Sequence, residues 1–542
     1  MLIIGKLSGI QNYLFDVAHE GGGQARRLRA RSFFIQLLVE TAAQRVLYAI
    51  NWPQQRLQFC NAGKFLLEGD DLNVEQQNAF NKTGREISSW LLEETNSDLH
   101  FSLVAQSGEG KLEQHYYSAM KQLARKEKQA WVDVVTNGQS WQVEKLILPS
   151  LDEPCELCRH RQVECNEDED GVTRHVCRQC FRDREIGKLL PTVKWAVLSP
   201  HASQNSFNVC GWHVTLTVSL PVFHQREIVL SLEAKQNGNG NATRNFIKRR
   251  LMPHIPLENN RPIEFVELAK KSRGDQLLGV LKMDGDKFGS HIKGLFQGTS
   301  GLNNLTKFSY ETDEFFAGTL TNLMKKEPWN LMIYTIFSGG DDLLLVGPWD
   351  VIFDFAGVVQ QKFYEQFNNR GLTLSGGMAF IKPKHPVRFA AKQAEELLEK
   401  AKNRPAPNAQ EGRNQLAAFG QIWKWWEHKI ILNCAHRLVE LVDKGVMQRG
   451  WLQTLLRLSE MRLHSRTPAD VGLAAARLAH TVARNYPRRN DPNQERVALR
   501  QWADNLIADF EHGKNVETRY LSAIIRYALT ATRIQREEKS YE

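Results

Sequence analysis

Four carboxylates in the middle of the chain have types and positions that could support metal-dependent chemistry on a nucleotide. Asp284 and Asp286 follow the apolar run 277–283, and Asp341 and Asp342 end a Ser-Gly-Gly-Asp-Asp turn between two further apolar runs. A pair at a strand end that faces a second pair at a hairpin turn can hold two Mg²⁺ ions, which activate a 3′-hydroxyl and hold a triphosphate. The turn glycines let the backbone approach a nucleotide closely. A solvated surface turn is the alternative, but such turns are rarely enclosed by apolar runs.

Two Cys-x-x-Cys pairs form a second constellation. Cys155 and Cys158 precede Cys177 and Cys180, with residues 159–176 between the pairs. Two such pairs can place four thiolates around one Zn²⁺ ion, and a site closed by four thiolates is structural. The alternative is four ordinary reduced cysteines. Three residues of the same stretch could replace one ligand: His160, Cys165 and His175.

The periodicity of apolar residues predicts two α+β units separated by the cysteine module and followed by a purely helical part. We expect a first α+β domain over residues 1–148 and the cysteine module over 149–190. A second α+β domain is expected over 191–425 and an arginine-rich helical bundle over 426–542. In the bundle, Thr467-Pro468 with Asp470 is typical of a capped helix start.

Composition is that of a folded protein. The 542 residues include 42% hydrophobic and 24% charged residues, which excludes a disordered, collagenous or disulfide-stapled chain. The sequence contains no apolar run of about 18 residues and no signal peptide at its start, so we expect a cytoplasmic protein without a membrane span. The net charge of +9 is compatible with nucleic-acid partners but does not require them.

Several other features are better explained by structure than by chemistry. The cluster Arg26–Arg31 favours a solvated helix start over contacts with phosphates. Trp423, Trp425 and Trp426 have helical spacing, which favours a place in the core over a base-stacking platform. Core cysteines are expected at Cys60, Cys210 and Cys434. Surface loops are expected at 236–243, 297–304 and 403–412, with an acidic tip at 164–171.

The motifs resemble those of a known superfamily. Asp-x-Asp-x-Phe at 284–288 followed by the Gly-Gly-Asp-Asp hairpin resembles the palm of polymerases and nucleotide cyclases, including the diguanylate cyclases. Further segments are similar to one family in particular, the Csm-type large polymerase subunit of type III CRISPR effector complexes. Those resembling its first palm are 7–11, 28–33 and 61–65, and those resembling its second palm are 334–349, 372–377 and 394–402.

The resemblance implies a multidomain α+β fold. It comprises two ferredoxin-like palm domains, a zinc-ribbon-like insertion and a C-terminal all-α bundle. It also implies an enzyme that converts ATP into cyclic oligoadenylates when its complex, with other subunits and crRNA, holds a target RNA. The implied catalytic residues, which bind Mg²⁺ or Mn²⁺, are Asp284, Asp286, Asp341 and Asp342. The implied nucleotide-binding residues are Ser338, Gly339, Gly340, Lys287, Lys402, Ser8, Gly9 and Lys64.

The first palm departs from the family pattern. Where relatives carry an aspartate before the Ser-Gly-Ile-Gln segment, this chain has Lys6 or Leu7, and the turn Asn61–Lys64 carries no acid. We therefore expect no metal there, although the backbone and Lys64 could still bind a second ATP. Two alternatives remain for the function: an enzyme resembling a diguanylate cyclase, and a catalytically silent scaffold subunit of an RNA-guided complex.

A first prediction concerns DNA cleavage. Many relatives begin with an HD nuclease domain, whereas this chain opens on the segment that resembles the first palm, and none of its sixteen histidines is followed by Asp. An HD site needs that adjacent pair to place an imidazole and a carboxylate on one metal. We therefore expect no cutting when the target-bound complex is incubated with single-stranded DNA and Mn²⁺ or Co²⁺. Cleavage that survives the loss of Asp341 and Asp342 would contradict this.

Overall fold

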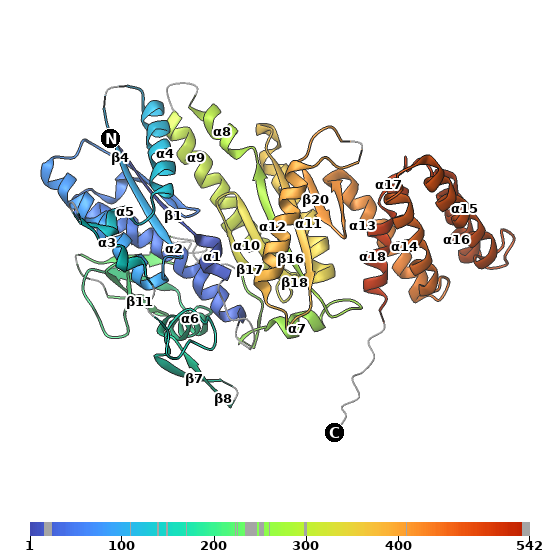
Figure 1. The fold of residues 1–542 in the computed structure, drawn as a ribbon, viewed down its shortest axis with the longest axis horizontal. Helices are drawn as coiled ribbons and strands as arrows, with labels where there is room; N and C mark the ends of the chain where they lie inside the picture. Colours follow the sequence, from blue (N-terminus) through green and yellow to red (C-terminus); the bar gives the residue numbers. More distant parts are fainter. Residues whose placement is uncertain are drawn as a thin grey trace. The chain divides into compact units, whose positions relative to one another are not determined.

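The structure is a computed structural model, and it divides into two compact units. Unit 1 comprises residues 1–264, 287–343 and 386–388, and unit 2 comprises the remainder. Figure 1 shows their helices and strands. The residues described are 1–15, 24–108, 110–137, 140–147, 150–169, 171–222, 224, 226–232, 246–248, 254–259, 261–296, 301–407 and 409–533.

Unit 1 begins with a four-stranded sheet of order β2-β3-β1-β4, in which β1 pairs antiparallel with both β3 and β4. Two long helices connect the strands, so the chain runs β1-α2-β2-β3-α3-β4, which is the ferredoxin-like arrangement expected of a palm. A short helix, α1 (Ile10–Phe15), follows β1. The other bounds are β1 Leu2–Ser8, α2 Gln24–Ala49, β2 Leu57–Asn61, β3 Lys64–Glu68, α3 Val74–Thr95 and β4 His100–Gln106.

Both faces of this sheet are covered because its strands carry apolar residues on both sides. Leu2 and Ile4 lie in a core with Leu123 of α4 (Leu112–Lys128) and Leu305 of α9 (Gly301–Asp313). Burial of each such side chain stabilises the fold by about 1.5–3 kcal/mol. Helix α2 is buried around most of its circumference, since it packs against the sheet and against helix α6 of the cysteine module (Figure 1).

The cysteine module consists of a hairpin and one helix. Strand β7 (Cys165–Glu169) pairs with β8 (Val172–Val176), and α6 (Arg178–Leu189) follows. The Sγ atom of Cys177 caps α6 by accepting a hydrogen bond of 3.4 Å from the amide of Cys180. The acidic surface tip predicted over 164–171 is partly wrong, because residues 165–169 form β7 and the side chain of Glu167 is completely buried, whereas Glu164 and Asp168 are exposed as predicted.

The rest of unit 1 contains a second sheet of order β10-β11-β9-β12-β13 and the first arm of the Gly-Gly-Asp-Asp hairpin, β17 (Tyr334–Gly339). The further bounds are α5 Val132–Val135, β5 Thr136–Asn137, β6 Ser140–Trp141, β9 Trp195–Ser199, β10 Phe207–Val209, β11 Trp212–Thr217, β12 Ile228–Ser231, β13 Phe246–Lys248, β14 Leu257–Glu258, β15 Arg261–Pro262, α8 Phe288–Leu295 and α10 Leu320–Met324.

Unit 2 is built around strands in the order β18-β16-β19-β20-β21. Strand β16 pairs antiparallel with β19, and β19 pairs parallel with β20. The chain order β16, helices, β17, β18, α11, β19 repeats that of the first palm, which agrees with the expected second palm. The bounds are α7 Phe265–Lys270, β16 Leu278–Asp286, β18 Asp342–Pro348, α11 Trp349–Phe367, β19 Thr373–Ile381, α12 Val387–Asn403, β20 Gln415–Ala418 and β21 Gln421–Lys424.

The end of the chain is helical, as predicted. Helix α15 starts as expected, with Thr467 as N-cap, Pro468 in its first turn and a capping box completed by Asp470. The buried carboxylate of Glu427 accepts hydrogen bonds of 2.8 Å from both Arg519 and Tyr520, which fixes the last helices to α13. The bounds are α13 Trp425–Asp443, α14 Arg449–Leu463, α15 Pro468–Asn485, α16 Gln494–Phe510, α17 Val516–Arg519 and α18 Leu521–Ala531.

Some of the structural expectations need correction. Trp423 and Trp425 are core residues as predicted, but Trp426 is 66% exposed. Cys210 is buried, whereas Cys60 and Cys434 are only half-buried. Gly301 begins α9, so the loop predicted over 297–304 is wrong from there on, and residues 297–300 and the predicted loop at 236–243 lie outside the described residues.

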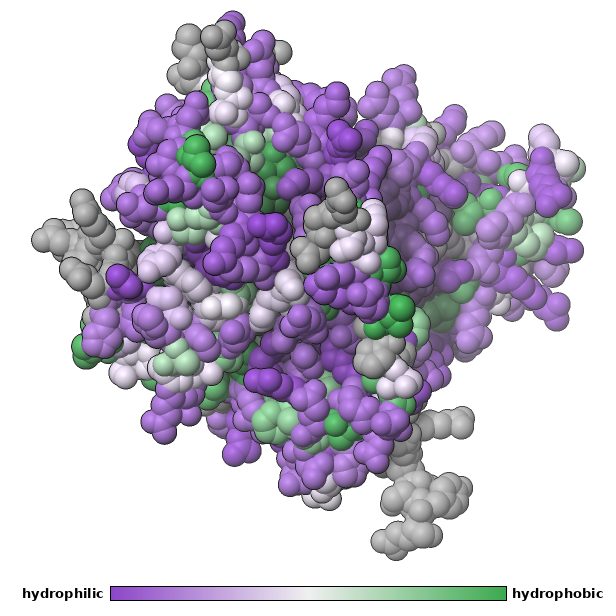
Figure 2. Space-filling view, turned by 60° about the vertical axis from the view of Figure 1, so that its left-hand side comes forward, coloured by the Kyte–Doolittle hydropathy of each residue, from purple (hydrophilic) through white to green (hydrophobic). Residues whose placement is uncertain are grey.

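No helix in the described part of the chain is long and apolar enough to cross a membrane. Figure 2 shows a face on which hydrophilic residues predominate and hydrophobic residues form small, separated patches. Small scattered patches of this kind are normal on a folded protein.

Candidate functional site

Two hairpin turns approach each other within unit 1. One is the Gly-Gly-Asp-Asp turn after β17, and the other is the β2–β3 turn of the first palm, which contains Ala62. Gly340 has a φ of +69°, and a Cβ atom added there would collide with the Cβ atom of Ala62. Glycine is therefore required at this position both by the backbone conformation and by the close approach of the two turns.

A cavity of about 310 Å³ lies beside the two turns. Its lining includes Ser338, Gly339, Asp341 and Asp342, and it continues over the first-palm turn and over α1 and α2. Both carboxylates are half-buried, and the hydroxyl of Ser338 donates a 2.6 Å hydrogen bond to the carbonyl of Phe316. The volume is at the lower end of the range for ligand sites, which suits part of a nucleotide.

Helix α2 supplies polar residues to this cavity that the sequence reading missed. Ser32, Gln36 and Glu40 all line it. Glu40 is 1% exposed and accepts a 2.8 Å hydrogen bond from Gln44, one turn further along the helix. Polar residues recur here at every fourth position of the helix, and residues at this spacing share one face. That recurrence is the signal that could have located the wall of the cavity.

The first palm carries cations near its turn. Lys6 lies directly opposite Lys64 on neighbouring strands, a like-charge pairing that is unfavourable by itself. Glu127 offsets it, because it forms an ion pair with Lys6 and accepts a 2.9 Å hydrogen bond from Ser8. Burial lowers the pKa of the Lys64 ammonium below its usual value, as does Lys6, whereas Asp341 opposes this shift. Lys64 therefore lies within the electrostatic reach of the Gly-Gly-Asp-Asp turn.

Ser8 and Gly9 were predicted to bind nucleotide, and their surroundings point to a structural role. The hydroxyl of Ser8 is used by Glu127, as described above. Gly9 has a φ of +86°, and a Cβ atom there would collide with the carbonyl oxygen of Asp98. The glycine allows α1 to start close to the loop that follows α3. The neighbouring residues Ile10 and Gln11 line the cavity instead.

Asp284 and Asp286 belong to unit 2, whereas Asp341 and Asp342 belong to unit 1. Asp284 is half-buried and forms an ion pair with Lys402. Burial acts to lower the pKa of the Lys402 ammonium, but Asp284 outweighs it and raises that pKa above its usual value. Lys287, also predicted to bind nucleotide, is an exposed residue of unit 1 with a φ of +61°.

Asp286 has different surroundings from Asp284. It is 1% exposed, and its carboxylate accepts hydrogen bonds from Thr373 Oγ1 (2.8 Å), from Ser375 Oγ (2.9 Å) and from the amide of Asn414 (2.9 Å). Three protein donors already occupy its oxygens. This arrangement suits a residue that holds the end of β16 more than one that binds a cation.

The four predicted cysteine ligands lie together. The Sγ atoms of Cys155, Cys158, Cys177 and Cys180 are all within 4.8 Å of one another, and all four residues are buried. The neighbouring thiols of Cys158, Cys177 and Cys180 lower the pKa of the Cys155 thiol, which favours the thiolate form that binds metals. The alternative ligands His160, Cys165 and His175 are not members of this group. The cluster has the composition of a closed tetrahedral metal site.

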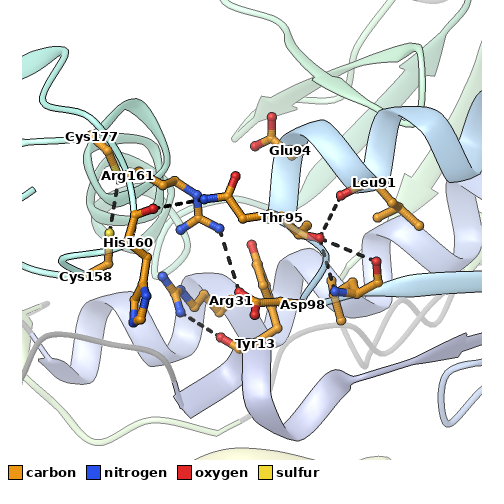
Figure 3. Close-up of polar contacts among 12 residues, drawn as sticks. Tyr13, Arg31, Leu91, Glu94, Thr95, Asp98, Cys158, His160, Arg161 and Cys177 are labelled. Atoms are coloured by element: carbon orange, nitrogen blue, oxygen red, sulfur yellow. Dashed lines mark hydrogen bonds and ion pairs between the residues drawn. The ribbon is translucent and has the colours of Figure 1, made fainter. Parts of the chain in front are cut away.

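Both interpretations of the Arg26–Arg31 cluster were wrong for three of its arginines. Arg27, Arg29 and Arg31 are each 1% exposed, so they are neither solvated nor available to a phosphate. Arg27 pairs with Glu167, and Arg31 donates a 2.9 Å hydrogen bond to Asp183. They attach α2 to the cysteine module, and Figure 3 shows the surroundings of Arg31.

Comparison with known proteins gives two family matches. Residues 1–135 match the family described as Csm1 subunit domain B, and residues 277–417 match the one described as Cas10/Cmr2, second palm domain. The first covers the four-stranded sheet of unit 1, and the second covers the Gly-Gly-Asp-Asp hairpin. Both matches are to domains of Cas10-type subunits, so the chain resembles this family over residues 1–135 and 277–417. The resemblance inferred from the motifs is thereby confirmed, and so is the fold class.

Individual members of the Cas10/Csm1 family resemble the chain over most of its length. The relative from Methanocaldococcus jannaschii is 24% identical over 74% of this chain and 56% of its own length. The relative from Mycobacterium tuberculosis is 24% identical over 93% of this chain and 64% of its own length. Both are named as CRISPR system single-strand-specific deoxyribonucleases of subtype III-A. The chain thus spans roughly three fifths of the length of these relatives.

Solved structures share the fold. A Csm1–Csm4 subcomplex of the type III-A interference complex matches with a TM-score of 0.72 and 19% identity over 98% of this chain and 70% of the other. A Csm1–Csm4 cassette in complex with cA4 matches with a TM-score of 0.70 and 18% identity over the same shares.

A second prediction follows from the surroundings of Asp286. Asp286→Asn should lower the free energy of unfolding by about 1–3 kcal/mol, because an amide NH₂ would face the donors that the carboxylate now accepts from. Urea unfolding followed by circular dichroism measures the difference. Glu411→Gln, an exposed change in the same loop as Asn414, is the matched control and should change stability by less than about 0.5 kcal/mol. Equal stability of the two variants would contradict the structural role.

Proposed function

We propose that this chain is the nucleotidyltransferase subunit of a type III-A CRISPR effector complex and polymerises ATP into cyclic oligoadenylates when the complex holds a target RNA. The observation that supports the proposal is the cavity of unit 1. Residues of both the Gly-Gly-Asp-Asp turn and the first-palm turn line it. Solved structures also support it, because the chain shares its fold with Csm1–Csm4 cassettes in complex with one ATP, with pppApApA and with cA4.

In this proposal Asp284, Asp341 and Asp342 hold the divalent cations Mg²⁺ or Mn²⁺. Bound cations would neutralise the triphosphate and activate the attacking 3′-hydroxyl. Strand β16 ends at Asp286 and strand β18 begins at Asp342, so each carboxylate pair lies at the end of an apolar strand, which is the sequence arrangement that supports this ligand set. Asp286 then acts as a support that holds the end of β16.

The remaining residues of the site bind and orient the nucleotides. The backbone of Gly339, where no atom would meet an added Cβ, gives a nucleotide room to approach the turn. Lys402 is placed to meet a triphosphate beside Asp284, and Lys287 offers a second exposed cation. In the first palm, Lys64 could meet the phosphates of a second ATP without a metal ion. Apolar residues of α1 and α2 in the cavity lining would exclude water from a bound base.

We also propose that the cysteine cluster binds one structural Zn²⁺ ion. Four buried thiols within 4.8 Å of one another match the ligand set of a closed tetrahedral site, in which no position remains for a substrate. A bound ion would fix the start of α6, because Cys177 caps this helix and Cys180 lies in its first turn.

The third prediction concerns this metal. The reduced, purified protein should contain about one zinc per chain, which elemental analysis measures. Cys177→Ser should lower the zinc content because three thiolates bind the ion less tightly. Cys165→Ser, a change in the same module but outside the cluster, should leave it unchanged. A protein without zinc, or zinc lost equally from both variants, would contradict the assignment.

The fourth prediction concerns catalysis. Replacing both Asp341 and Asp342 by Ala should reduce ATP conversion at least about 10³-fold, because two oxygen ligands for the cations are removed. Folding and complex assembly should be unaffected, since both side chains lie at a turn. Lys6→Ala is the matched control in the first palm and should have a small effect. Wild-type rates in the double variant would disprove the assignment.

The decisive assay also separates the alternative functions. ATP or GTP is offered with Mg²⁺ or Mn²⁺, with and without the guide complex and target RNA, and the products are resolved by chromatography. Cyclic oligoadenylates that depend on target RNA would support the proposal. A dinucleotide made from GTP would favour the diguanylate cyclase alternative. The absence of any product in the complete complex would favour a silent scaffold.

A further inference from the structure

We propose that Arg31 is a positioning residue that couples the cysteine module to the wall of the nucleotide cavity. The inference rests on the proposed function, because it assumes that the cavity of unit 1 binds ATP. It concerns α1, Arg31, Asp183 and a second contact made by Arg161, all of which belong to unit 1.

The wall in question is the short helix α1. Ile10, Gln11 and Leu14 of this helix line the cavity. A helix of six residues is too short to be stable alone, so its position depends on its neighbours. The carbonyl groups of its last turn also have no partner within the helix.

Arg31 supplies a partner for one of these carbonyls. Its Nη1 atom donates a 2.7 Å hydrogen bond to the carbonyl of Tyr13, in the last turn of α1 (Figure 3). Its Nε atom donates a 2.9 Å hydrogen bond to Asp183, and the guanidinium carbon lies 5.0 Å from the centre of the Tyr13 ring. One buried side chain thus contacts both α1 and the cysteine module.

The module end of this contact lies next to the cysteine cluster. Asp183 is one helical turn after Cys180 on α6, and Cys177 caps the same helix. A shift of the cluster therefore moves the start of α6 and with it the carboxylate that holds Arg31. Asp183 also pairs with Arg182, at 3.1 Å, but Arg31 is itself only 1% exposed, so its release from Asp183 would weaken the pairing of a buried guanidinium. The position of α1 should consequently follow the state of the cluster.

A second contact reaches α1 from the other cysteine pair. The carbonyl of Arg161 accepts a 2.8 Å hydrogen bond from the amide of Cys155. The guanidinium of Arg161 lies 3.8 Å from the carboxylate of Asp98 (Figure 3). The carbonyl of Asp98 in turn packs against Gly9, directly before α1. Asn96 strengthens this connection with a 3.0 Å hydrogen bond to the carbonyl of His160.

Helix α2 also offers a matched control. Arg27 is one turn before Arg31 and has the same 1% exposure, and it also pairs with a carboxylate of the module. Its partner, Glu167, lies in the β7 strand of the hairpin rather than in α6. If the arginines only attach the module to α2, weakening either pair should have the same consequence. If Arg31 positions α1, only its weakening should reach the cavity.

The fifth prediction compares Arg31→Lys with Arg27→Lys in the full-length protein. Lysine keeps the charge beside Asp183, but its compact ammonium cannot reproduce the two diverging hydrogen bonds of the guanidinium. Isothermal titration with a non-hydrolysable ATP analogue and Mg²⁺ should show about tenfold weaker binding for Arg31→Lys. Arg27→Lys should bind the analogue like the wild type. Zinc content and the midpoint of thermal unfolding should change equally in both variants.

Further results decide the remaining cases. Equal analogue affinity for Arg31→Lys and wild type, or equal weakening in both variants, overturns the positioning role while the proposed function stands. A wild-type protein that does not bind the analogue overturns the proposed function and this inference together. Should Arg31→Lys lose its zinc, Arg161→Gln takes its place, because its side chain contacts the partly exposed Asp98. Wild-type affinity in Arg161→Gln would then refute the coupling, and weakened binding with zinc retained would support it.

Discussion

The buried charges between α2 and the cysteine module are the constraint on which unit 1 depends. Arg27 with Glu167 and Arg31 with Asp183 place four charged groups at 2% exposure or less. Removing such groups from water costs several kcal/mol for each ion, which only close pairing offsets. The module therefore has to dock on α2 in one arrangement. Because the same helix lines the cavity of unit 1, that arrangement also shapes the candidate site.

The two palms share one order of elements but differ in the charge of their turns. The turn after β17 presents Asp341 and Asp342, whereas the corresponding turn of the first palm is followed by Lys64, opposite Lys6. Two acidic palms facing each other would repel unless cations filled the space between them. The lysines at the first-palm turn remove that repulsion between the two turns of unit 1. The close approach at Gly340 and Ala62 is compatible with this difference in charge.

Local patterns in the sequence were sufficient to predict the order of the elements and to locate the carboxylate pairs and the cysteine cluster. Glycine-acid turns and Cys-x-x-Cys pairs are short, so their meaning depends little on the rest of the fold. Long-range pairing could not be predicted in this way. Arg27 and Arg31 looked solvated because their partners are 140 and 152 residues away. Glu167 looked like part of an exposed acidic loop for the same reason.

Within the candidate site, the sequence predicts the residue types but not the partners that surround each residue. Asp284 and Asp286 are two positions apart and identical in type, yet one pairs with Lys402 and the other is enclosed by donors from β19 and from the loop before β20. Only the folded arrangement distinguishes them.

The distance along the chain between the paired charges has a consequence for biosynthesis. Arg31 leaves the ribosome 152 residues before Asp183, a delay of roughly 8–30 s at about 5–20 residues per second. During that time the nascent α2 carries two arginines, Arg27 and Arg31, that will later be enclosed but still lack their carboxylates. The first palm can form its sheet early, since β1 to β4 end at residue 106. The wall of its cavity can be completed only after the cysteine module has emerged, so the order of synthesis delays this part of the first palm until a later segment of the chain has folded.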